Sequence, residues 1–456
     1  MAISNPTAVP GAQHARPGAY AWAVLAVLCF VYVLNFLDRQ LLSILAKPIQ
    51  DELGISDGQI GLISGLYFAM FYCILAIPVG LLADRTNRVK VLAFSCGLWS
   101  AATAACGLAA NYPQLAVARM AVGVGEAGGV PPSYAIISDY FPPGMRGTAL
   151  SLFNLGPPIG MALGIAFGAS VAAAYSWRLA FIWIGVIGVL TAIFVWFWMR
   201  EPKRGGLDVK PAAVDEPVAT LVDATDTPPA ADTAAVPAKS PFWGTVRLFF
   251  TDPVLLRVSL ACAATQFMTY AVLNFTVLFL MREKGMELGD VAVWYAIVIL
   301  LGVGGGMFVS GRLIDKWGPR NRTAYAWLPA IGLALAVPLF AAFVWAPSWQ
   351  LALVFLLVPT GLNYFYLSPS VALVQEEVRP DQRVVAGALL LLVMNLVGLG
   401  FGPTYLGFMS DFFARTNPEN SLQLAFYTLI PVYFVAIAMF FWLARALKRS
   451  GKEAAA

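Results

Sequence analysis

The sequence predicts an all-α membrane protein with twelve transmembrane helices arranged in two bundles of six. Its 456 residues are 59% hydrophobic and only 12% charged, whereas soluble domains average about a quarter charged residues. The mean hydropathy is +0.74. A bilayer core of about 30 Å needs about 20 apolar residues per helix, and apolar runs of that length recur on both sides of one long polar segment.

Twelve apolar runs are long enough to span a membrane, six before the polar segment and six after it. Proline and glycine interrupt several of them, which membrane helices tolerate better than soluble helices do. The predicted spans are 20–46, 58–82, 89–110, 114–138, 148–173, 178–199, 254–281, 290–312, 323–345, 350–375, 384–412 and 421–445.

The polar segments set the expected domain boundaries. We expect an N-terminal tail, a first bundle, a linker, a second bundle and a C-terminal tail over 1–19, 20–200, 201–250, 251–447 and 448–456. Residues 201–240 are rich in proline, alanine, aspartate and threonine and lack aromatic residues. Such a segment cannot bury a core, so it is predicted to be disordered. The sequence FWGTVRLFF (242–250) predicts a short amphipathic helix at the membrane interface.

Lysine and arginine indicate the orientation. They gather in the two tails, in the linker and in one set of alternate loops. Positive charge marks the cytoplasmic side, so both termini are expected in the cytoplasm. The first nineteen residues are polar and lack the short apolar run of a cleavable signal peptide. We expect a multi-pass protein of the cell membrane, which is the inner membrane in a Gram-negative bacterium.

Several functional classes are disfavoured by composition. The net charge of +4 comes from basic residues dispersed between apolar segments, which is no nucleic-acid footprint. The five cysteines all lie in apolar runs and are expected to be buried rather than paired or metal-bound. The single histidine, His14, lies in the tail. No Walker A, HExxH or Ser-His arrangement is visible, so we expect no cofactor, no metal and no enzyme.

The two halves share a loop motif. GLLADRTNRVK (80–90) follows the second span and GRLIDKWGPR (311–320) follows the eighth. Asn87 stands where the second copy has Gly318, and we expect both to adopt a left-handed turn, which Asn tolerates next best after Gly. Two such bundles, related by an axis along the membrane normal, are the parallel-repeat pattern of many secondary transporters.

These loops, together with RMAVGVG (119–125) in the fourth span, resemble the major facilitator superfamily over nearly the whole chain. YVLNFLDRQLLSILAKPIQDELGISDGQIG (32–61) and the glutamate of GVGEAGG resemble the spinster branch, whose members export lysophospholipids and sphingosine-1-phosphate. Bacterial sugar-acid symporters have a similar first span with an Asp-Arg pair. The resemblance implies that spans one, four, seven and ten line a central cavity, around which two bundles rock.

Four ionisable residues are embedded in the spans: Asp38 and Arg39 in the first, Arg119 and Glu126 in the fourth. At 1.5 Å per residue from the outer helix ends, Asp38 is about 13 Å deep, Arg119 about 9 Å and Glu126 about 19 Å. Arg119 and Glu126 share a face, because seven residues make nearly two turns. The four can therefore meet if both helices face one cavity.

The cluster suggests a proton-linked anion site. Protonating Asp38 or Glu126 would release Arg39 or Arg119, whose planar guanidinium suits a phosphate or carboxylate. The alternative is a structural ion-pair cluster. Embedded ionisable residues are functional by default, and a brace alone does not need two acids and two bases.

The second half offers neutral and aromatic candidates for the opposite wall, which could also be ordinary packing. With Asn35 of the first span, the candidate substrate contacts are Gln266, Tyr270, Asn274, Asn363, Tyr364 and Tyr366. A cavity with one charged wall and one apolar-aromatic wall suits an amphiphile with an anionic head. The rival interpretations are a symporter of a small organic or sugar acid and a non-transporting membrane receptor.

The repeated loops carry charges that we expect to act as a cytoplasmic gate between the bundles, namely Asp84, Arg85, Arg88, Asp315 and Lys316. Alternatively, these charges only cap helix ends and set topology. The expected partners are a small amphipathic substrate, protons and the lipid bilayer, with no nucleic acid, and we expect a monomer.

Overall fold

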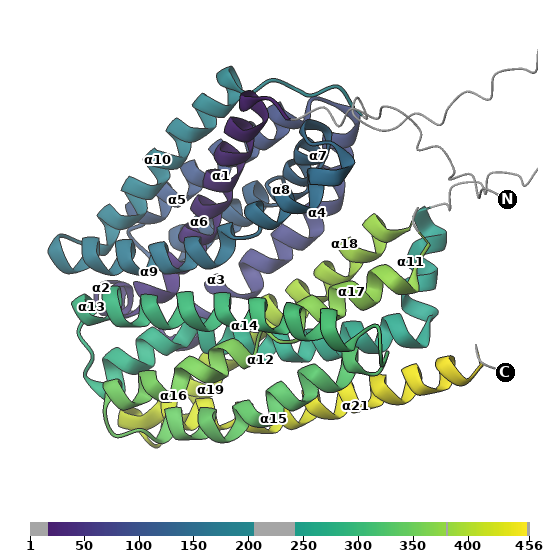
Figure 1. Cartoon of the computed structure of the whole chain (residues 1–456). Coiled ribbons are helices and arrows are strands. Elements are labelled where there is room, and N and C mark those ends of the chain that lie inside the picture. Colours follow the sequence, from purple (N-terminus) through teal and green to yellow (C-terminus); the bar gives the residue numbers. More distant parts are fainter. Residues whose placement is uncertain (1–16, 205–241, 380–381, 454–456) are drawn as a thin grey trace, which may run out of the picture.

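The computed structural model describes residues 17–204, 242–379 and 382–453. Its regular elements in those ranges are all helices, and Figure 1 shows two groups of helices, one from each half of the chain. The groups come together near α2 and α13 and spread apart toward α7, α11 and α18 (Figure 1). We call the end with α2 (Ala46–Leu53) and α13 (Leu288–Asp290) the distal side, and the opposite end, where the chain enters the first helix, the tail side.

Over residues 17–204, the first half contains ten helices. They are α1 (Ala19–Ile44), α2, α3 (Asp57–Ser64), α4 (Leu66–Arg85), α5 (Arg88–Leu108), α6 (Tyr112–Glu126), α7 (Val130–Tyr140), α8 (Pro143–Phe153), α9 (Gly156–Ala174) and α10 (Trp177–Trp198).

The second half begins with α11 (Phe242–Thr251), the helix expected at the interface. It continues with α12 (Pro253–Lys284), α13, the π-helix η1 (Val291–Tyr295), α14 (Ala296–Trp317), α15 (Ala324–Trp345), α16 (Trp349–Leu362), α17 (Leu367–Glu377), α18 (Arg383–Met394), the π-helix η2 (Asn395–Phe401), α19 (Gly402–Ala414), η3 (Pro418–Asn420), α20 (Ser421–Tyr427) and α21 (Leu429–Glu453).

The predicted spans match this architecture closely. In the part of the chain that the structure describes, eleven helical segments are long and apolar enough to cross a membrane. The remaining predicted span, 114–138, is formed by α6 and α7 in succession. A three-residue turn at 127–129 separates them, and Pro131 and Pro132 in the first turn of α7 lack the N–H needed to continue α6.

Glycines allow the two halves to touch on the distal side, where α3 lies against α19. A Cβ atom on Gly61 would lie 2.5 Å from the carbonyl oxygen of Pro403. One on Gly407 would lie 2.3 Å from the carbonyl oxygen of Asp57. Neither distance is possible for a real side chain, so glycine is what permits this backbone approach.

Polar groups reinforce the same contact. Arg282 of α12 donates from Nη1 and Nη2 to the two carboxylate oxygens of Asp57, each at 2.7 Å. Asp411 of α19 accepts from the backbone N–H groups of Asp57 at 3.0 Å and Gly58 at 2.9 Å. A carboxylate from the second half thus caps the N-terminus of a helix in the first half, where the unpaired N–H groups and the dipole favour negative charge.

The start of the predicted linker differs from expectation. Glu201 accepts hydrogen bonds from Arg88 Nε at 2.9 Å and Val89 N at 3.0 Å. Arg204 donates to the backbone carbonyl groups of Asp84 and Thr86. The prediction of disorder from residue 201 is therefore wrong for 201–204, because these side chains cap the α4–α5 loop. Residues 205–241 lie outside the described residues.

The predicted left-handed turn in the repeated loop is also wrong. Asn87 has φ −83° and is the N-cap of α5, where its side chain accepts a 2.8 Å hydrogen bond from Lys90 N. Gly318 has φ −54°. Glycine is needed there for space, because a Cβ would lie 2.7 Å from the carbonyl oxygen of Ile314. Left-handed glycines occur instead at Gly54 and Gly285, with φ of 63° and 68°.

Candidate functional site

The four embedded charges meet between α1 and α6. Arg39 Nε lies 2.6 Å from Glu126 Oε2, and Arg119 Nη1 lies 3.7 Å from Asp38 Oδ1. The side chain of Arg39 is 11% exposed, and those of the other three are 2% exposed or less. The expectation that these residues converge is thus met, and each acid lies beside one arginine.

Aromatic rings surround the arginines. The guanidinium carbon of Arg39 lies 4.9 Å from the ring centre of Phe36, 5.2 Å from Phe68 and 5.1 Å from Tyr72. That of Arg119 lies 5.6 Å from the Phe68 ring. Cation–π attraction stabilises a guanidinium in an apolar setting without an additional anion.

A glycine on α6 lets α4 bring Phe68 between the two arginines. A Cβ on Gly123 would lie 2.6 Å from the backbone oxygen of Phe68, so a larger residue would push α4 away. Gly123 lies between Arg119 and Glu126 in the sequence, on the face that the spacing predicted. The close approach of α4 therefore follows from the residue type at one position.

Thr103 of α5 is a member of the site that the sequence did not reveal. Its hydroxyl lies 2.5 Å from Asp38 Oδ2. Both residues are buried, at 0% and 1% exposure. A threonine within an apolar span is common and carries no sign of its partner, so only the structure identifies this contact.

The cluster is matched in charge but not in hydrogen bonds. Within the described residues, Arg119 Nε and Nη1, Glu126 Oε1 and Asp38 Oδ1 are buried and have no hydrogen-bond partner. Buried polar atoms of this kind carry a free-energy cost that a ligand can offset. Arg119 in particular presents two unused donors.

These residues face a pocket of about 390 Å³ that both halves line, which we call the central pocket. Its apolar and aromatic walls come from both halves, while its charges come from the first half only. It is lined by Phe36, Arg39, Gln40, Ser64, Phe68, Arg119 and Met161 of the first half and by Tyr270, Leu273, Asn274 and Leu399 of the second.

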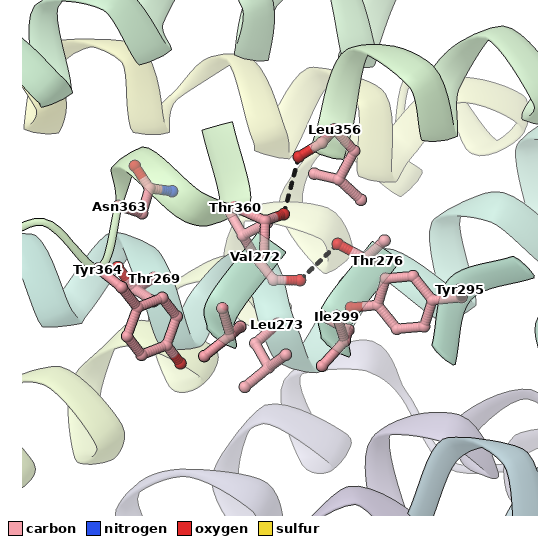
Figure 2. Close-up of a pocket in the computed structure, with 11 residues that line it drawn as sticks. Thr269, Val272, Leu273, Thr276, Tyr295, Ile299, Leu356, Thr360, Asn363 and Tyr364 are labelled. Atoms are coloured by element: carbon pink, nitrogen blue, oxygen red, sulfur yellow. Dashed lines mark hydrogen bonds between the residues drawn. The ribbon is translucent and has the colours of Figure 1, made fainter. Parts of the chain in front are cut away.

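A second pocket of about 300 Å³ lies within the second half, and we call it the lateral pocket. Figure 2 shows its residues on α12, α16 and the segment around Tyr295. Three of its hydroxyl groups donate within their own helices: Thr276 to the carbonyl oxygen of Val272 at 2.7 Å, Thr360 to that of Leu356 at 2.8 Å and Thr269 to that of Thr265 at 2.8 Å. Leu273 lines both pockets.

The neutral candidates from the sequence divide between these places. Tyr270 and Asn274 line the central pocket. Asn363 and Tyr364 line the lateral pocket. Asn35 is buried, with a carbonyl oxygen that has no hydrogen-bond partner among the described residues, and it belongs to neither lining.

Tyr366 and Gln266 belong to a buried hydrogen-bond chain. Tyr366 OH donates to Gln266 Oε1 at 2.8 Å, and Gln266 Nε2 donates to Asn395 Oδ1 at 2.9 Å. The chain joins α12, the turn before α17 and the π-helix η2. Neither Tyr366 nor Gln266 belongs to the described lining of the two pockets.

The loop charges lie on the tail side. Arg88 is buried and donates to Asp139 at 2.6 Å and to Glu201 at 2.9 Å, all within the first half. Asp84, Arg85, Asp315 and Lys316 are exposed. A charge latch between the halves is thus not formed by Arg88 in this arrangement. Over the described ranges, no group of three or more His, Cys, Asp or Glu residues could hold a metal ion.

Comparison with known proteins gives a consistent result. The profile of the Major Facilitator Superfamily matches residues 28–403. An MFS-type efflux pump of Mycolicibacterium smegmatis is 31% identical over 453 residues, which cover 98% of this chain and 98% of that protein. Protein spinster homolog 1 of Homo sapiens is 26% identical over 430 residues, which cover 89% of this chain and 76% of that protein.

A solved structure is also similar. It is the crystal structure of a bacterial homologue of the human lysosomal transporter spinster, in an inward-facing and unoccupied conformation. It superposes with a TM-score of 0.82 at 28% sequence identity, covering 94% of this chain and 98% of that one.

Proposed function

The chain belongs to the major facilitator superfamily and is a spinster-like, multi-pass secondary transporter. We propose that it carries an anionic amphipathic lipid, either in exchange for protons or together with them. The cargo class is a monoacyl lipid with a phosphate head, such as a lysophospholipid. Members of this family move solutes and are not enzymes.

The observation that carries the proposal is the pair of unused donors on Arg119. Nε and Nη1 are buried without a hydrogen-bond partner, and Arg119 lines the central pocket. A guanidinium fork binds two oxygens of a phosphate or carboxylate at once. An anionic head group in the central pocket would accept hydrogen bonds from donors that have no hydrogen-bond partner among the described residues.

Proton coupling follows from competition for the same arginines. Glu126 holds Arg39 at 2.6 Å, and Asp38 lies 3.7 Å from Arg119. A proton on either acid removes a negative partner and leaves an arginine for the cargo. Loss of that proton restores the ion pair and favours release.

The pockets of the second half would accommodate the apolar chain of a lipid cargo. Leu273 separates the central pocket from the lateral pocket and lines both. The lateral pocket is lined mainly by aliphatic residues, threonine side chains and two tyrosines. A head beside Arg119 and a chain running past Leu273 would use both cavities.

We also propose that the tail side is cytoplasmic, as the lysine and arginine distribution indicates. On the distal side, hydrogen bonds that involve Arg282, Asp57 and Asp411 join the two halves. In this orientation the arrangement is inward-facing, and the loop charges Asp84, Arg85, Asp315 and Lys316 would meet only when the cytoplasmic side closes. Rocking of the halves around the central pocket would expose it alternately.

The test is binding of a lysophosphatidylglycerol series of increasing acyl length to purified protein in nanodiscs. Each buried methylene contributes about 0.8 kcal/mol, so affinity should rise by up to about fourfold per carbon. Arg119→Gln should weaken every chain length by a similar factor, because it contacts the head only. Leu273→Ala should flatten the dependence on chain length.

Arg247→Gln is the matched control, because Arg247 is an exposed arginine on α11 outside both pockets. It should bind the whole series like the wild type. If glycerol phosphate or glucuronate competes as well as the long-chain lysolipid, the lipid proposal is wrong.

One observation favours a second candidate, a symporter of a small sugar acid. The central pocket places polar groups beside its arginines, namely Gln40 and Ser64 of the first half and Asn274 of the second. This polar lining suits a hexuronate whose carboxylate binds Arg39 or Arg119 and whose hydroxyl groups bind the neutral side chains. The same competition experiment separates the two candidates, since only the sugar acid would compete at low concentration.

A further inference from the structure

Thr103 stands between two hydrogen-bond acceptors. Its Oγ1 lies 2.5 Å from Asp38 Oδ2 and 2.9 Å from the backbone oxygen of Trp99. Asp38 is 1% exposed, Thr103 is 0% exposed and Trp99 is 1% exposed, so the three groups have no contact with bulk water. Their hydrogen bonds must be satisfied among themselves and their neighbours.

The number of hydrogen atoms available for these hydrogen bonds depends on the protonation state of Asp38. A threonine hydroxyl has one hydrogen and can donate fully to only one acceptor. With Asp38 ionised, the hydroxyl donates to Oδ2 and leaves the Trp99 carbonyl to the helix bond alone. With Asp38 protonated on Oδ2, the acid donates to Thr103 Oγ1, and the hydroxyl donates to the Trp99 carbonyl. Both short contacts are then hydrogen bonds.

We propose that Thr103 is the positioning residue of the proton site: it holds the Asp38 carboxyl in place in both protonation states and makes Oδ2 the oxygen that carries the proton. One proton from a hydronium ion adds to Oδ2 and leaves a water molecule, the O–H bond of Thr103 rotates from Asp38 to Trp99, and no other bond changes. Loss of the proton reverses the rotation.

The consequence concerns Arg119. Asp38 Oδ1 faces Arg119 Nη1 at 3.7 Å, whereas Oδ2 faces Thr103. Because the Thr103 contact fixes which oxygen points to which partner, protonation of Oδ2 neutralises the acid without turning it away from Arg119. The guanidinium then keeps its place in the central pocket with no anionic partner. The inference deepens the proposed function by naming the residue that orients its proton site.

Several other groups face this carboxyl. Arg39 is its neighbour on α1, Cys106 lies one turn beyond Thr103 on α5, and Arg119 and Glu126 come from α6. The helix α9, which packs along α1, carries no ionisable side chain. Replacing Thr103 changes none of these charges, so its effect on titration can be attributed to the hydroxyl.

The experiment is infrared difference titration of the full-length protein in nanodiscs, without cargo. The C=O stretching band lost in Asp38→Asn reports protonated Asp38. In Thr103→Val the ionised form loses a charge-assisted donor, which is the stronger of the two hydrogen bonds. Protonation should therefore persist to higher pH, with a midpoint raised by roughly one pH unit. The band should also shift, because the acid no longer donates to Oγ1.

Two controls isolate the hydroxyl. Thr103→Ser keeps it and should titrate near the wild-type midpoint. Thr265→Val removes a buried hydroxyl that donates to its own helix at 2.9 Å, away from any carboxylate, and should leave the Asp38 band unchanged. If Thr103→Val does not fold, Thr103→Ala serves in its place, since it removes the same group without adding bulk.

A midpoint that is the same in Thr103→Val or Thr103→Ala as in the wild type would overturn the inference. So would a wild-type band that does not change with pH. A raised midpoint together with cargo binding that ignores pH would leave Thr103 as the positioning residue of Asp38 and would reject the proposed proton coupling. The two proposals can therefore fail separately.

Discussion

The two buried acids are held differently, and this difference divides their roles. Glu126 makes a short ion pair with Arg39, whose guanidinium is also ringed by Phe36, Phe68 and Tyr72. Asp38 has a hydroxyl partner and a more distant arginine. In the proposed mechanism, removing the charge of Glu126 would therefore release Arg39 most directly, while Asp38 would act on Arg119.

Glu126→Gln is expected to remove the part of the pH dependence of cargo binding that arises from Arg39. Glutamine has the shape of protonated glutamate but cannot ionise, so Arg39 stays available at alkaline pH. Lysophosphatidylglycerol should bind roughly tenfold tighter than to the wild type at alkaline pH, since a charged hydrogen bond contributes about 1.5–3 kcal/mol. Calorimetric or fluorescence binding over a pH series measures this directly.

Glu419→Gln, at an exposed glutamate of the distal loop, is the control and should behave like the wild type. If Glu126→Gln keeps the wild-type pH response, the proton role belongs to Asp38 alone or must be abandoned.

At the scale of single residues, the four embedded charged residues could be identified from the sequence, because ionisable residues are rare in apolar spans. It could not give their pairing, because helix depth fixes height but not rotation. Thr103, Phe68 and Tyr72 remained hidden for another reason. They are ordinary residues of apolar spans, and their role arises only from the helices that pack beside them.

At the scale of elements, the distal contact depends on glycine. Gly61 and Gly407 allow α3 and α19 to approach at backbone distance. Asp411 and Arg282 then bind the N-terminal end of α3. If the protein alternates between two arrangements, this contact must separate when the distal side opens. Its strength should therefore set how often that happens.

Gly61→Ala is expected to shift the protein toward a distal-open arrangement. The added Cβ would lie 2.5 Å from the backbone oxygen of Pro403, so the helices must move apart. Overpacking typically costs about 1–3 kcal/mol, which would raise the open population at least about fivefold. Double electron–electron resonance between spin labels attached through Asp51→Cys and Ala414→Cys, which flank this contact, would show a longer distance than in the protein with Gly61.

Gly304→Ala on α14 is the control, because a Cβ there meets nothing within 4 Å. A distance distribution in Gly61→Ala that matches this control would show that the α3–α19 approach does not limit opening.

The spans themselves were predictable because length and apolarity define them, and their ends agree within a few residues over most of the chain. The breaks within the spans were less predictable. Gly128 and Gly129 mark the break between α6 and α7, yet glycine is equally common inside unbroken membrane helices. The assumption about Asn87 failed because it read a turn from residue type, whereas the side chain caps α5.

At the scale of the whole molecule, the halves share an architecture but not a chemistry. Gly54 and Gly285 end the first long helical unit of each half in the same left-handed conformation, at the spacing that also separates Gly80 from Gly311. This supports a parallel repeat. The embedded charges lie only in the first half, while the second half contributes aromatic, amide and aliphatic groups. The site is therefore complete only when both halves contribute to it.

The connection between the halves offers a test of orientation. Residues 205–240 contain Lys239, which is followed by a serine, and are predicted from composition to lack a core. Trypsin should cut there in sealed vesicles only when it is added on the cytoplasmic side. The two fragments should stay together during purification in mild detergent, because Arg282 and Asp411 of the second half bind α3 of the first.

The variant Lys239→Gln should resist cutting at this site and serves as the control for cleavage elsewhere. The fragments are separated by gel electrophoresis and identified by mass. Protection from the cytoplasmic side with cutting from the opposite side would reverse the orientation. The distal contact would then face the cytoplasm, and the arrangement described here would be open to the outside rather than to the inside.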